Sequence, residues 1–353
     1  MKRNKTVKRK LLAFCLCLVL FLCTGCTQGS KSNSPYQNTD FAMGTVISQN
    51  IYGENSKDCA GQVLSLIKDL EKIISWRIED SDIARINQSA GTGQSVTVEE
   101  KLAEWLNDCR DVYEKSGGAL DVTVGPVARL WDIGGDNPRV PEDSEIQNVL
   151  PLVNGSKLKV DGQQVAFETE SGKVDLGAVG KGIACDEIAK QLDEKVSGTF
   201  SVGGSVLIYG KKPDGSAWKI GVQNPRGEDG ENMGVLTLSQ GEKDRTFVST
   251  SGDYEKYIEE DGVRYHHIMD PRTGYPADSG LISVTIISKS GFLSDALSTA
   301  CFVAGRKEGK KLAEQYGAEA IFIDEEKQVT MTDGAKDLFT ILIKEYQETD
   351  ETK

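Results

Sequence analysis

Hydrophobic and polar residues are arranged along this 353-residue chain with two different periods. Apolar residues recur every three to four positions over residues 57–74 and 98–116, which predicts two amphipathic helices. Short stretches rich in β-branched and aromatic residues predict strands, and Asp161-Gly162 predicts a hairpin turn within the first of them; the stretches are 157–168, 197–210, 218–223, 281–288 and 318–324. Because the two patterns interleave with no repeat and no second linker, the sequence predicts one α+β domain over residues 39–346 and a polar tail over 347–353.

The first 38 residues differ in composition from the rest of the chain. Residues 1–10 are strongly basic, and residues 11–22 form an apolar run too short to span a bilayer comfortably. The segment then ends in Thr-Gly-Cys and resembles a bacterial lipoprotein signal, in which residues 1–25 are removed and Cys26 is lipidated. An uncleaved N-terminal anchor is the alternative. In both cases we expect the body outside the cytoplasm, attached to the bacterial cell membrane, with residues 26–38 as a polar tether.

Charge and cysteine content limit the possible partners. Removing residues 1–25, which hold six basic and no acidic residues, changes the formal net charge from −13 to −19. Such a chain is a poor partner for nucleic acid, and any anionic ligand must be met by local basic groups, helix N-termini or a metal. The cysteines of the body have no CxxC spacing, which disfavours a sulfur-bound metal. Two of them lie in apolar helical patterns and are predicted to be core residues, Cys185 and Cys301.

The only two histidines of the chain are adjacent, at His266 and His267. A hairpin turning at 261–262 places them on its return strand, where alternation points them to opposite faces, with Met269 on the face of His267. An isolated histidine pair is more often structural than functional. The adjacent basic, glycine-containing loop at 272–274 favours a function, so both interpretations are open.

Residues 173–192 predict a short strand, a glycine-rich turn and an amphipathic helix. Lys181 supplies a positive charge where the helix begins, and a helix N-terminus attracts anions. The stretch is not a Walker A loop, because Gly182 stands where that motif requires Ser or Thr. It is therefore either a simple helix-start turn or a phosphate contact.

Residues 288–305 predict a helix that ends at Gly305. Asp295 and Thr299 are four residues apart and thus share one face of it. A carboxylate with a hydroxyl suits a hard cation such as Mg²⁺, which binds few protein oxygens and completes its shell with phosphate and water. The alternative is an ordinary polar helix face.

Eight motifs occur in the order typical of one known family. They are AMGT (42–45), SWRIEDSDIARIN (75–87), GGALDVTVGPVARLW (117–131), DLGAVGKGIACD (175–186), SVGGSVLIYG (201–210), STSGDYEKY (249–257), HHIMDPRTGYP (266–276) and SDALSTA (294–300). Each is weak alone, but together they are highly specific, and over residues 40–345 the chain resembles the ApbE family of FAD:protein FMN transferases. The resemblance implies an α+β fold with a central flavin-binding cleft.

The resemblance also implies a set of site residues. His267 matches the family's catalytic base, and the Mg²⁺ site matches Asp295, Thr299 and the backbone carbonyl of Ala178. The positions that match FAD contacts are Met43, Arg77, Ala119, Leu120, Asp121, Asp175, Lys181 and Ile268. Arg77 is a departure, because family members often carry Tyr there.

The implied activity is Mg²⁺-dependent cleavage of the FAD pyrophosphate. FMN is transferred to a Thr or Ser hydroxyl of an exported target protein, giving a phosphoester-linked flavoprotein and AMP; electron-transfer subunits are the targets that the family suggests. An imidazole with a pKa near 6.5 is a suitable base for this step at neutral pH. Two alternatives stay open: a Mg²⁺-dependent FAD pyrophosphatase that gives FMN and AMP, and a non-catalytic FAD-binding lipoprotein. The last would have no need of His267 or of the pair formed by Asp295 and Thr299.

Overall fold

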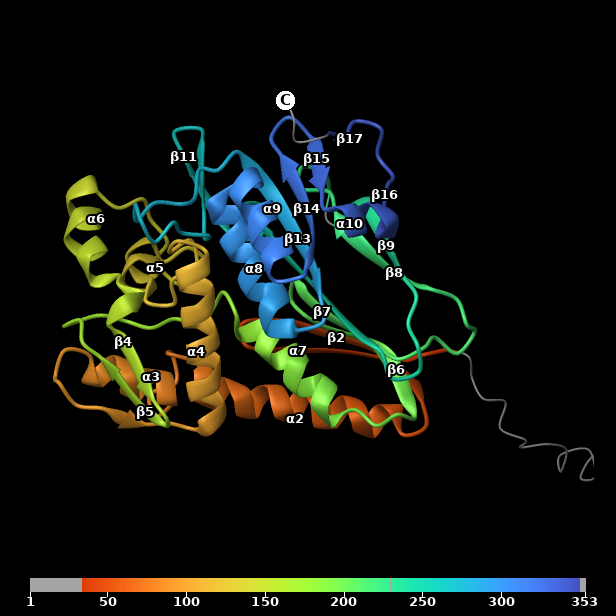
Figure 1. Cartoon of the computed structure of the whole chain (residues 1–353), viewed down its shortest axis with the longest axis horizontal. Coiled ribbons are helices and arrows are strands. Elements are labelled where there is room, and N and C mark those ends of the chain that lie inside the picture. The colour runs from red at the N-terminus through yellow and green to blue at the C-terminus, as the bar shows by residue number, and fades with distance from the viewer. Residues whose placement is uncertain (1–33, 229, 350–353) are drawn as a thin grey trace, which may run out of the picture. The chain divides into compact units, whose positions relative to one another are not determined.

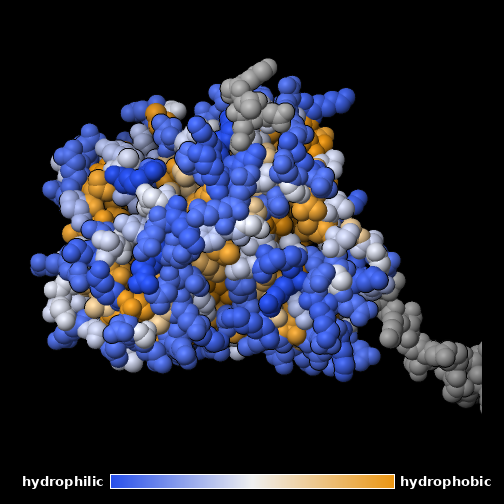
Figure 2. Space-filling model, viewed as in Figure 1, coloured by the Kyte–Doolittle hydropathy of each residue, from blue (hydrophilic) through white to orange (hydrophobic). Residues whose placement is uncertain are grey.

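A computed structural model of the chain describes residues 34–228 and 230–349. The predicted signal peptide, Cys26 and most of the predicted tether lie outside these residues. From Pro35 onward the described residues form one compact unit, as the predicted single domain requires. No helix within the described ranges is long and apolar enough to cross a membrane. Figure 2 shows hydrophilic residues over most of the viewed face, with hydrophobic patches between them.

A nine-stranded sheet organises the fold (Figure 1). Its strand order is β1-β2-β6-β7-β10-β13-β14-β15-β17, and all neighbours are antiparallel except the parallel pair β15 and β17. The strands are β1 (Tyr36–Ala42), β2 (Thr45–Gly53), β6 (Val196–Val202), β7 (Ser205–Tyr209), β10 (Arg245–Gly252), β13 (Leu281–Ser288), β14 (Glu319–Asp324), β15 (Gln328–Met331) and β17 (Gln347–Glu348).

Both faces of this sheet are covered, and β14 shows how the sequence achieves it. Ala320 and Phe322 point into one core, while Ile321 and Ile323 point into a second core on the opposite face. The first core is closed by helices α2 (Ser56–Ile74), α4 (Glu100–Lys115), α7 (Gly180–Gln191), α8 (Gly291–Ala304) and α9 (Arg306–Gln315). The second is closed by β8 (Trp218–Gln223), β9 (Asn232–Leu238), β16 (Phe339–Ile341) and α10 (Asp333–Leu338).

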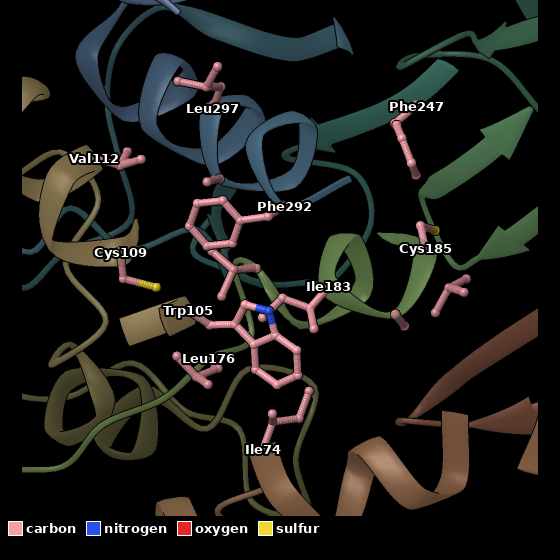
Figure 3. Close-up of a cluster of buried hydrophobic side chains, with 14 of the residues drawn as sticks. Ile74, Trp105, Cys109, Val112, Leu176, Ile183, Cys185, Phe247, Phe292 and Leu297 are labelled. Carbon is pink, nitrogen blue, oxygen red and sulfur yellow. The ribbon is translucent and has the colours of Figure 1, made fainter. Parts of the chain in front are cut away.

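The first core joins the helices that later carry the site. Figure 3 shows Trp105 of α4 among Ile74, Leu176 and Ile183, with Phe292 of α8 close by. All five side chains are at least 94% buried, so each removes a large apolar area from water. Cys185 and Cys301 are also buried here, which confirms their prediction as core residues.

The remaining elements lie beside the sheet, on the left of Figure 1. The segment from residue 82 to residue 167 contributes α3 (Asp82–Ser89), α5 (Gly125–Trp131), α6 (Asp143–Val149) and a small sheet of β3 (Val96–Thr97), β5 (Gln164–Phe167) and β4 (Leu158–Asp161). A separate hairpin consists of β11 (Tyr257–Glu260) and β12 (Val263–His266). Its turn residues Asp261 and Gly262 have φ of 51° and 79°, the left-handed pair that a tight hairpin needs.

Most predicted elements are confirmed. The predicted helices 57–74 and 98–116 are α2 and α4, and the predicted strands 218–223 and 281–288 have the bounds of β8 and β13. The predicted hairpin at Asp161-Gly162 joins β4 to β5.

Several boundaries differ from the prediction. The predicted strand 197–210 is a hairpin of two strands, β6 and β7. Residues 36–38 of the predicted tether begin β1, whose mostly polar residues hid its strand character, and residues 347–348 of the predicted tail form β17. The predicted strand near residue 173 is only an isolated bridge between Lys173 and Val124, because the chain turns away immediately afterwards. Finally, β12 ends at His266, so strand alternation extends neither to His267 nor to Met269, and it is not what separates the two histidines.

Candidate active site

Helices α7 and α8 touch at their first turns through two glycines. A Cβ atom on Gly182 would lie 2.1 Å from the carbonyl oxygen of Gly291, and one on Gly291 would lie 2.3 Å from that of Gly182. Only residues without a Cβ permit this approach. It brings Asp295, one turn into α8, to the start of α7, where its Oδ2 accepts a hydrogen bond of 2.9 Å from the Gly182 backbone N–H.

Asp295 is the central polar group of this region. Its other oxygen, Oδ1, accepts a 3.0 Å hydrogen bond from the Ser205 hydroxyl and lies 3.6 Å from Lys181 Nζ. The residue is only 4% exposed, so it does not belong to a solvated polar helix face. Thr299, one turn further along α8, is half-buried with its Oγ1 3.3 Å from the Ser251 hydroxyl. Asp295 therefore lies inside the fold where α8 meets α7, and Thr299, one turn further along, lies against β10.

The carbonyl of Ala178 is left open by the same contact. In a regular helix the Gly182 N–H would donate to the Ala178 carbonyl, but here it donates to Asp295. No described residue donates to the Ala178 oxygen in its place. A carboxylate, a hydroxyl and a carbonyl are the oxygen donors that suit Mg²⁺. No group of three or more His, Cys, Asp or Glu side chains forms a metal site within residues 34–228 and 230–349. A metal held here would thus need the hydroxyl and carbonyl oxygens, together with oxygens of its ligand.

Two tight turns enclose Lys181. Gly203, in the turn between β6 and β7, has φ of 57°, and a Cβ there would lie 2.6 Å from Thr45 Oγ1 and 3.3 Å from Lys181 Cδ. Met43, in the turn between β1 and β2, has φ of 50°, and its Cε lies 3.4 Å from a Cβ position on Gly180. Segments from three distant motifs therefore meet at the first residues of α7.

The two histidines occupy different environments. His266 is buried, its Nε2 donates a 3.0 Å hydrogen bond to the Ala277 carbonyl, and its Nδ1 accepts one of 3.3 Å from the Ile268 N–H. Its ring also meets Phe302 edge to face. His267 is exposed, and its Nδ1 lies 3.3 Å from the Lys256 carbonyl. Donation from Nδ1 to that carbonyl leaves the lone pair of His267 on Nε2, free to accept a proton.

The pKa of His267 differs from the value near 6.5 that the sequence analysis assumed. Although solvent reaches the residue, surrounding protein restricts the hydration of its ring and lowers its pKa well below the usual value near 6.5. The ammonium groups of Lys181 and Lys256 lower the pKa of His267 further. The ring is therefore neutral at pH 7, and the charge of Lys181 is near enough to the ring to act on its pKa.

The remaining predicted residues have mixed placements. Ala119, Leu120 and Ile268 are buried in the first core. Asp121 turns both carboxylate oxygens inward, to Thr123 and to the Gly155 N–H. Asp175 accepts a 2.8 Å hydrogen bond from the Gly177 N–H, directly before Ala178.

The arginine in the loop after the histidines, Arg272, is already paired with a carboxylate. Arg272 pairs in bidentate fashion with Asp270, at 2.8 Å for both contacts. Its charge is neutralised within the loop, so the loop gives no support to a function for the histidine pair.

Sequence reasoning missed one group beside the site. The guanidinium carbons of Arg77 and Arg129 lie 4.2 Å and 4.0 Å from the centre of the Trp76 ring. We call these three residues the Trp76 cluster. Arg129 comes from α5, more than fifty residues away, and no local pattern in the sequence indicates the contact.

Two pockets lie away from this region. One is a very small cavity beside Asp121 and Tyr113, and the other, of about 220 Å³, lies between Glu314–Glu319 and Thr332–Gly334. Neither contains a histidine or a lysine. The chemistry of the residues around α7, and not the size of a pocket, therefore identifies the candidate site.

Fold and site together define an α+β protein with a carboxylate, a hydroxyl, an ammonium group and an imidazole around the start of one helix, an arrangement suited to phosphate chemistry. The ApbE family model matches residues 43–322, and the chain belongs to this family. This confirms the resemblance found in the sequence.

Individual relatives agree. The chain is 30% identical to a Treponema pallidum protein named FAD:protein FMN transferase, over 92% of this chain and 94% of the relative. A Klebsiella pneumoniae protein of the same name is also 30% identical, over 90% and 98%. The crystal structure of the Thermotoga maritima ApbE protein is similar with a TM-score of 0.78 at 34% identity, over 86% of this chain and 99% of that chain. The Pseudomonas stutzeri flavinyl transferase ApbE gives 0.74 at 30% identity, over 88% and 98%. These structures confirm the predicted α+β fold.

Proposed function

We propose that this protein is an FAD:protein FMN transferase that moves FMN from FAD to a Thr or Ser hydroxyl of an exported protein and releases AMP. The observation that carries the proposal is the grouping of Asp295, Lys181 and a neutral His267 around the first turn of α7. The names of the relatives support flavin transfer. The acceptor residue, the metal and the leaving group are what the family resemblance implies.

Each group has a distinct role in this reaction. Asp295, Thr299 and the Ala178 carbonyl would hold Mg²⁺, which supplies charge neutralisation to the pyrophosphate of FAD when bound. Lys181 adds a second positive charge at the same place. His267 Nε2 accepts the proton of the acceptor hydroxyl while the hydroxyl oxygen forms a bond to the phosphorus of the FMN half. The bond from that phosphorus to the bridging oxygen breaks, and AMP leaves with the bridging oxygen.

A second activity uses the same residues. If water takes the place of the protein hydroxyl, the products are FMN and AMP, and the protein is a pyrophosphatase. Arg77 favours keeping this alternative, because it stands where family members often carry Tyr and it changes the surroundings of FAD. A purely FAD-binding lipoprotein is the weaker alternative, because it would not need a neutral imidazole near Lys181.

We also propose the extracytoplasmic location that the N-terminal sequence predicts. Residues 1–25 would be removed as a signal peptide, and lipidated Cys26 would anchor the protein to the bacterial cell membrane. The partners would then be FAD and exported proteins, with membrane electron-transfer subunits as the first candidates.

One experiment separates the three activities. The full chain is incubated with FAD and Mg²⁺, with and without the exported protein fraction of the source bacterium, and products are followed by chromatography and by flavin fluorescence of proteins after denaturing electrophoresis. Covalent flavin on a protein together with AMP supports the transferase. Free FMN with AMP in both samples supports the pyrophosphatase, and unchanged FAD in both rejects the proposal. The His267→Ala variant is the control for background reaction.

A further inference from the structure

In the Trp76 cluster, the guanidinium groups of Arg77 and Arg129 stack on the Trp76 ring, and neither forms an ion pair with a described carboxylate. Among the described residues no carboxylate lies within 4.0 Å of either guanidinium of Arg77 or Arg129. The Nε atom of Arg129 is fully buried, and it has no hydrogen-bond partner in the part of the chain that is described. Buried polar atoms almost always have a partner, so an unpaired Nε is unusual. Arg129 as a whole is only half-buried, so a ligand can reach its guanidinium through the terminal N–H groups although Nε itself is covered.

The surroundings of Arg129 make this arrangement unfavourable in the empty protein. Burial lowers the pKa of Arg129. The charge of Asp175 partly opposes this effect, and the charge of Arg77 lowers the pKa of Arg129 again by a smaller amount. Lys173 is a third positive group near Arg129. Burial lowers the pKa of Lys173, and the charge of Arg129 lowers it further. Among the described residues, Asp175 is the one negative group acting on Arg129, but it forms no ion pair with it. A half-buried cation is normally paired, and its retention without a pair needs an explanation.

The cluster borders the candidate active site. Ile74 is the last residue of α2, and Gly180 is the first residue of α7. A Cβ atom added to Gly180 would lie 3.2 Å from Ile74 Cδ1. Trp76 follows two residues later, so the cluster is close to the start of α7. On the other side, Asp175 acts on Arg129 and precedes the Ala178 carbonyl by three residues. The unpaired cations therefore lie next to the place where the proposed pyrophosphate substrate is held.

We propose that Arg129 contacts FAD directly, donating from its guanidinium to an oxygen of the dinucleotide. Trp76 holds the guanidinium plane in place through stacking, and Arg77 adds positive charge alongside. The oxygen belongs either to a phosphate or to a carbonyl of the flavin ring, both of which a planar guanidinium can bind. This inference rests on the proposed function only in taking FAD as the ligand, and it holds for a transferase and for a pyrophosphatase alike.

Binding without turnover tests the inference. FAD affinity of the full chain is measured by flavin fluorescence in the presence of EDTA, for the wild type, Arg129→Met and Arg129→Lys. Arg264→Met is the matched control, because Arg264 also stacks on an aromatic ring, at 4.1 Å from Tyr257, but has a carboxylate partner in Glu259. We expect Arg129→Met to weaken FAD binding about tenfold to hundredfold, which is the effect of losing a hydrogen bond from a charged group. Arg129→Lys should weaken it less, and Arg264→Met should bind as the wild type does.

Thermal stability excludes a merely structural role. Because Arg129 is unpaired beside other cations, the ligand-free Arg129→Met protein should melt at the wild-type temperature or above it, while the increase in Tm on adding FAD becomes smaller. FAD affinity equal to wild type in Arg129→Met would overturn the inference. If Arg129→Met does not fold, Arg129→Lys decides the question. Wild-type FAD affinity of Arg129→Lys, together with a ligand-free Tm of that variant below the wild-type value, would count against the inference.

Fragments of FAD identify the acceptor oxygen. In Arg129→Met, a loss of affinity for AMP, or for FMN but not for riboflavin, assigns the contact to a phosphate. A loss of affinity for riboflavin assigns the contact to the flavin ring. Equal affinity of wild type and variant for FAD and for both fragments rejects the contact. Failure of the proposed function is visible separately, as wild-type protein that binds FAD but forms neither AMP nor a flavin-labelled protein.

Discussion

Replacing each histidine by alanine should separate a catalytic from a structural imidazole. The two residues are adjacent in the chain, so both variants make the same chemical change one position apart. In His267→Ala the lost ring is exposed and makes one 3.3 Å contact, to the Lys256 carbonyl. In His266→Ala the lost ring is buried, makes two hydrogen bonds and packs on Phe302.

These contacts set the magnitudes. Removing the exposed ring of His267 should change the free energy of unfolding by about 0.5 kcal/mol or less. Loss of general-base assistance should lower kcat about 10²–10⁴-fold, equivalent to roughly 3–5 kcal/mol in the activation barrier. Removing the ring of His266 leaves the Ala277 carbonyl and the Ile268 N–H without partners and creates a cavity. We expect a loss of about 2–5 kcal/mol in stability, with less than tenfold change in kcat of the folded protein.

The pH dependence adds an independent test. Because the pKa of His267 lies well below 6.5, the wild-type rate should stay level as the pH falls through 6.5 and decrease only at more acidic pH. Burial also lowers the pKa of His266, so the unfolded state binds more protons than the folded state below pH 6.5. This contribution to stability is fully present above about pH 6.5 and is lost as the pH falls toward the folded pKa. His266→Ala should therefore lose stability less steeply on acidification than the wild type.

The assay combines urea unfolding with single-turnover formation of AMP from FAD, measured from pH 5 to pH 8. His267→Ala must retain FAD binding for the rate comparison to be valid. Comparable kinetic losses in both variants, or a large loss only in His266→Ala, would refute the assignment. An acidic limb centred near pH 6.5 in the wild type would refute the lowered pKa.

Three further predictions concern other parts of the chain. Asp295→Ala should abolish Mg²⁺-dependent turnover and keep Mg²⁺-independent FAD binding by fluorescence, and undiminished turnover would contradict the metal assignment. Gly182→Ala places a Cβ 2.1 Å from the Gly291 carbonyl and should cost about 1–3 kcal/mol in urea unfolding, whereas Gly61→Ala, where the added Cβ meets nothing within 4 Å, should be neutral or stabilising. Cys26→Ser should block lipidation and should therefore release the protein from membranes. If the variant is processed and fractionates as the wild type does, the lipid anchor is ruled out.

Local periodicity was sufficient for most of the secondary structure. The stripe along α2 and the alternation along β13 depend on neighbours within a few residues, and both elements were predicted nearly to their ends. β1 was missed because it pairs at the sheet edge through backbone groups while most of its side chains are polar. The short stretch near Lys173 was predicted as a strand from its apolar residues, but these residues are buried by packing without a paired strand.

For the candidate site, the sequence by itself determined the residue types and their local spacing. The four-residue spacing of Asp295 and Thr299 required that they share a helix face, and the adjacency of the histidines on a hairpin indicated different roles. Tertiary structure alone decided that Asp295 is buried against the Gly182 N–H, 113 residues away, that Lys181 lies 3.6 Å from Asp295, and that Arg129 stacks on Trp76. The physical reason is that hydrogen bonds, desolvation and charge interactions act through space. Their strength depends on which distant segments the packing of glycines and core side chains brings together, and no periodicity within one segment encodes that distance.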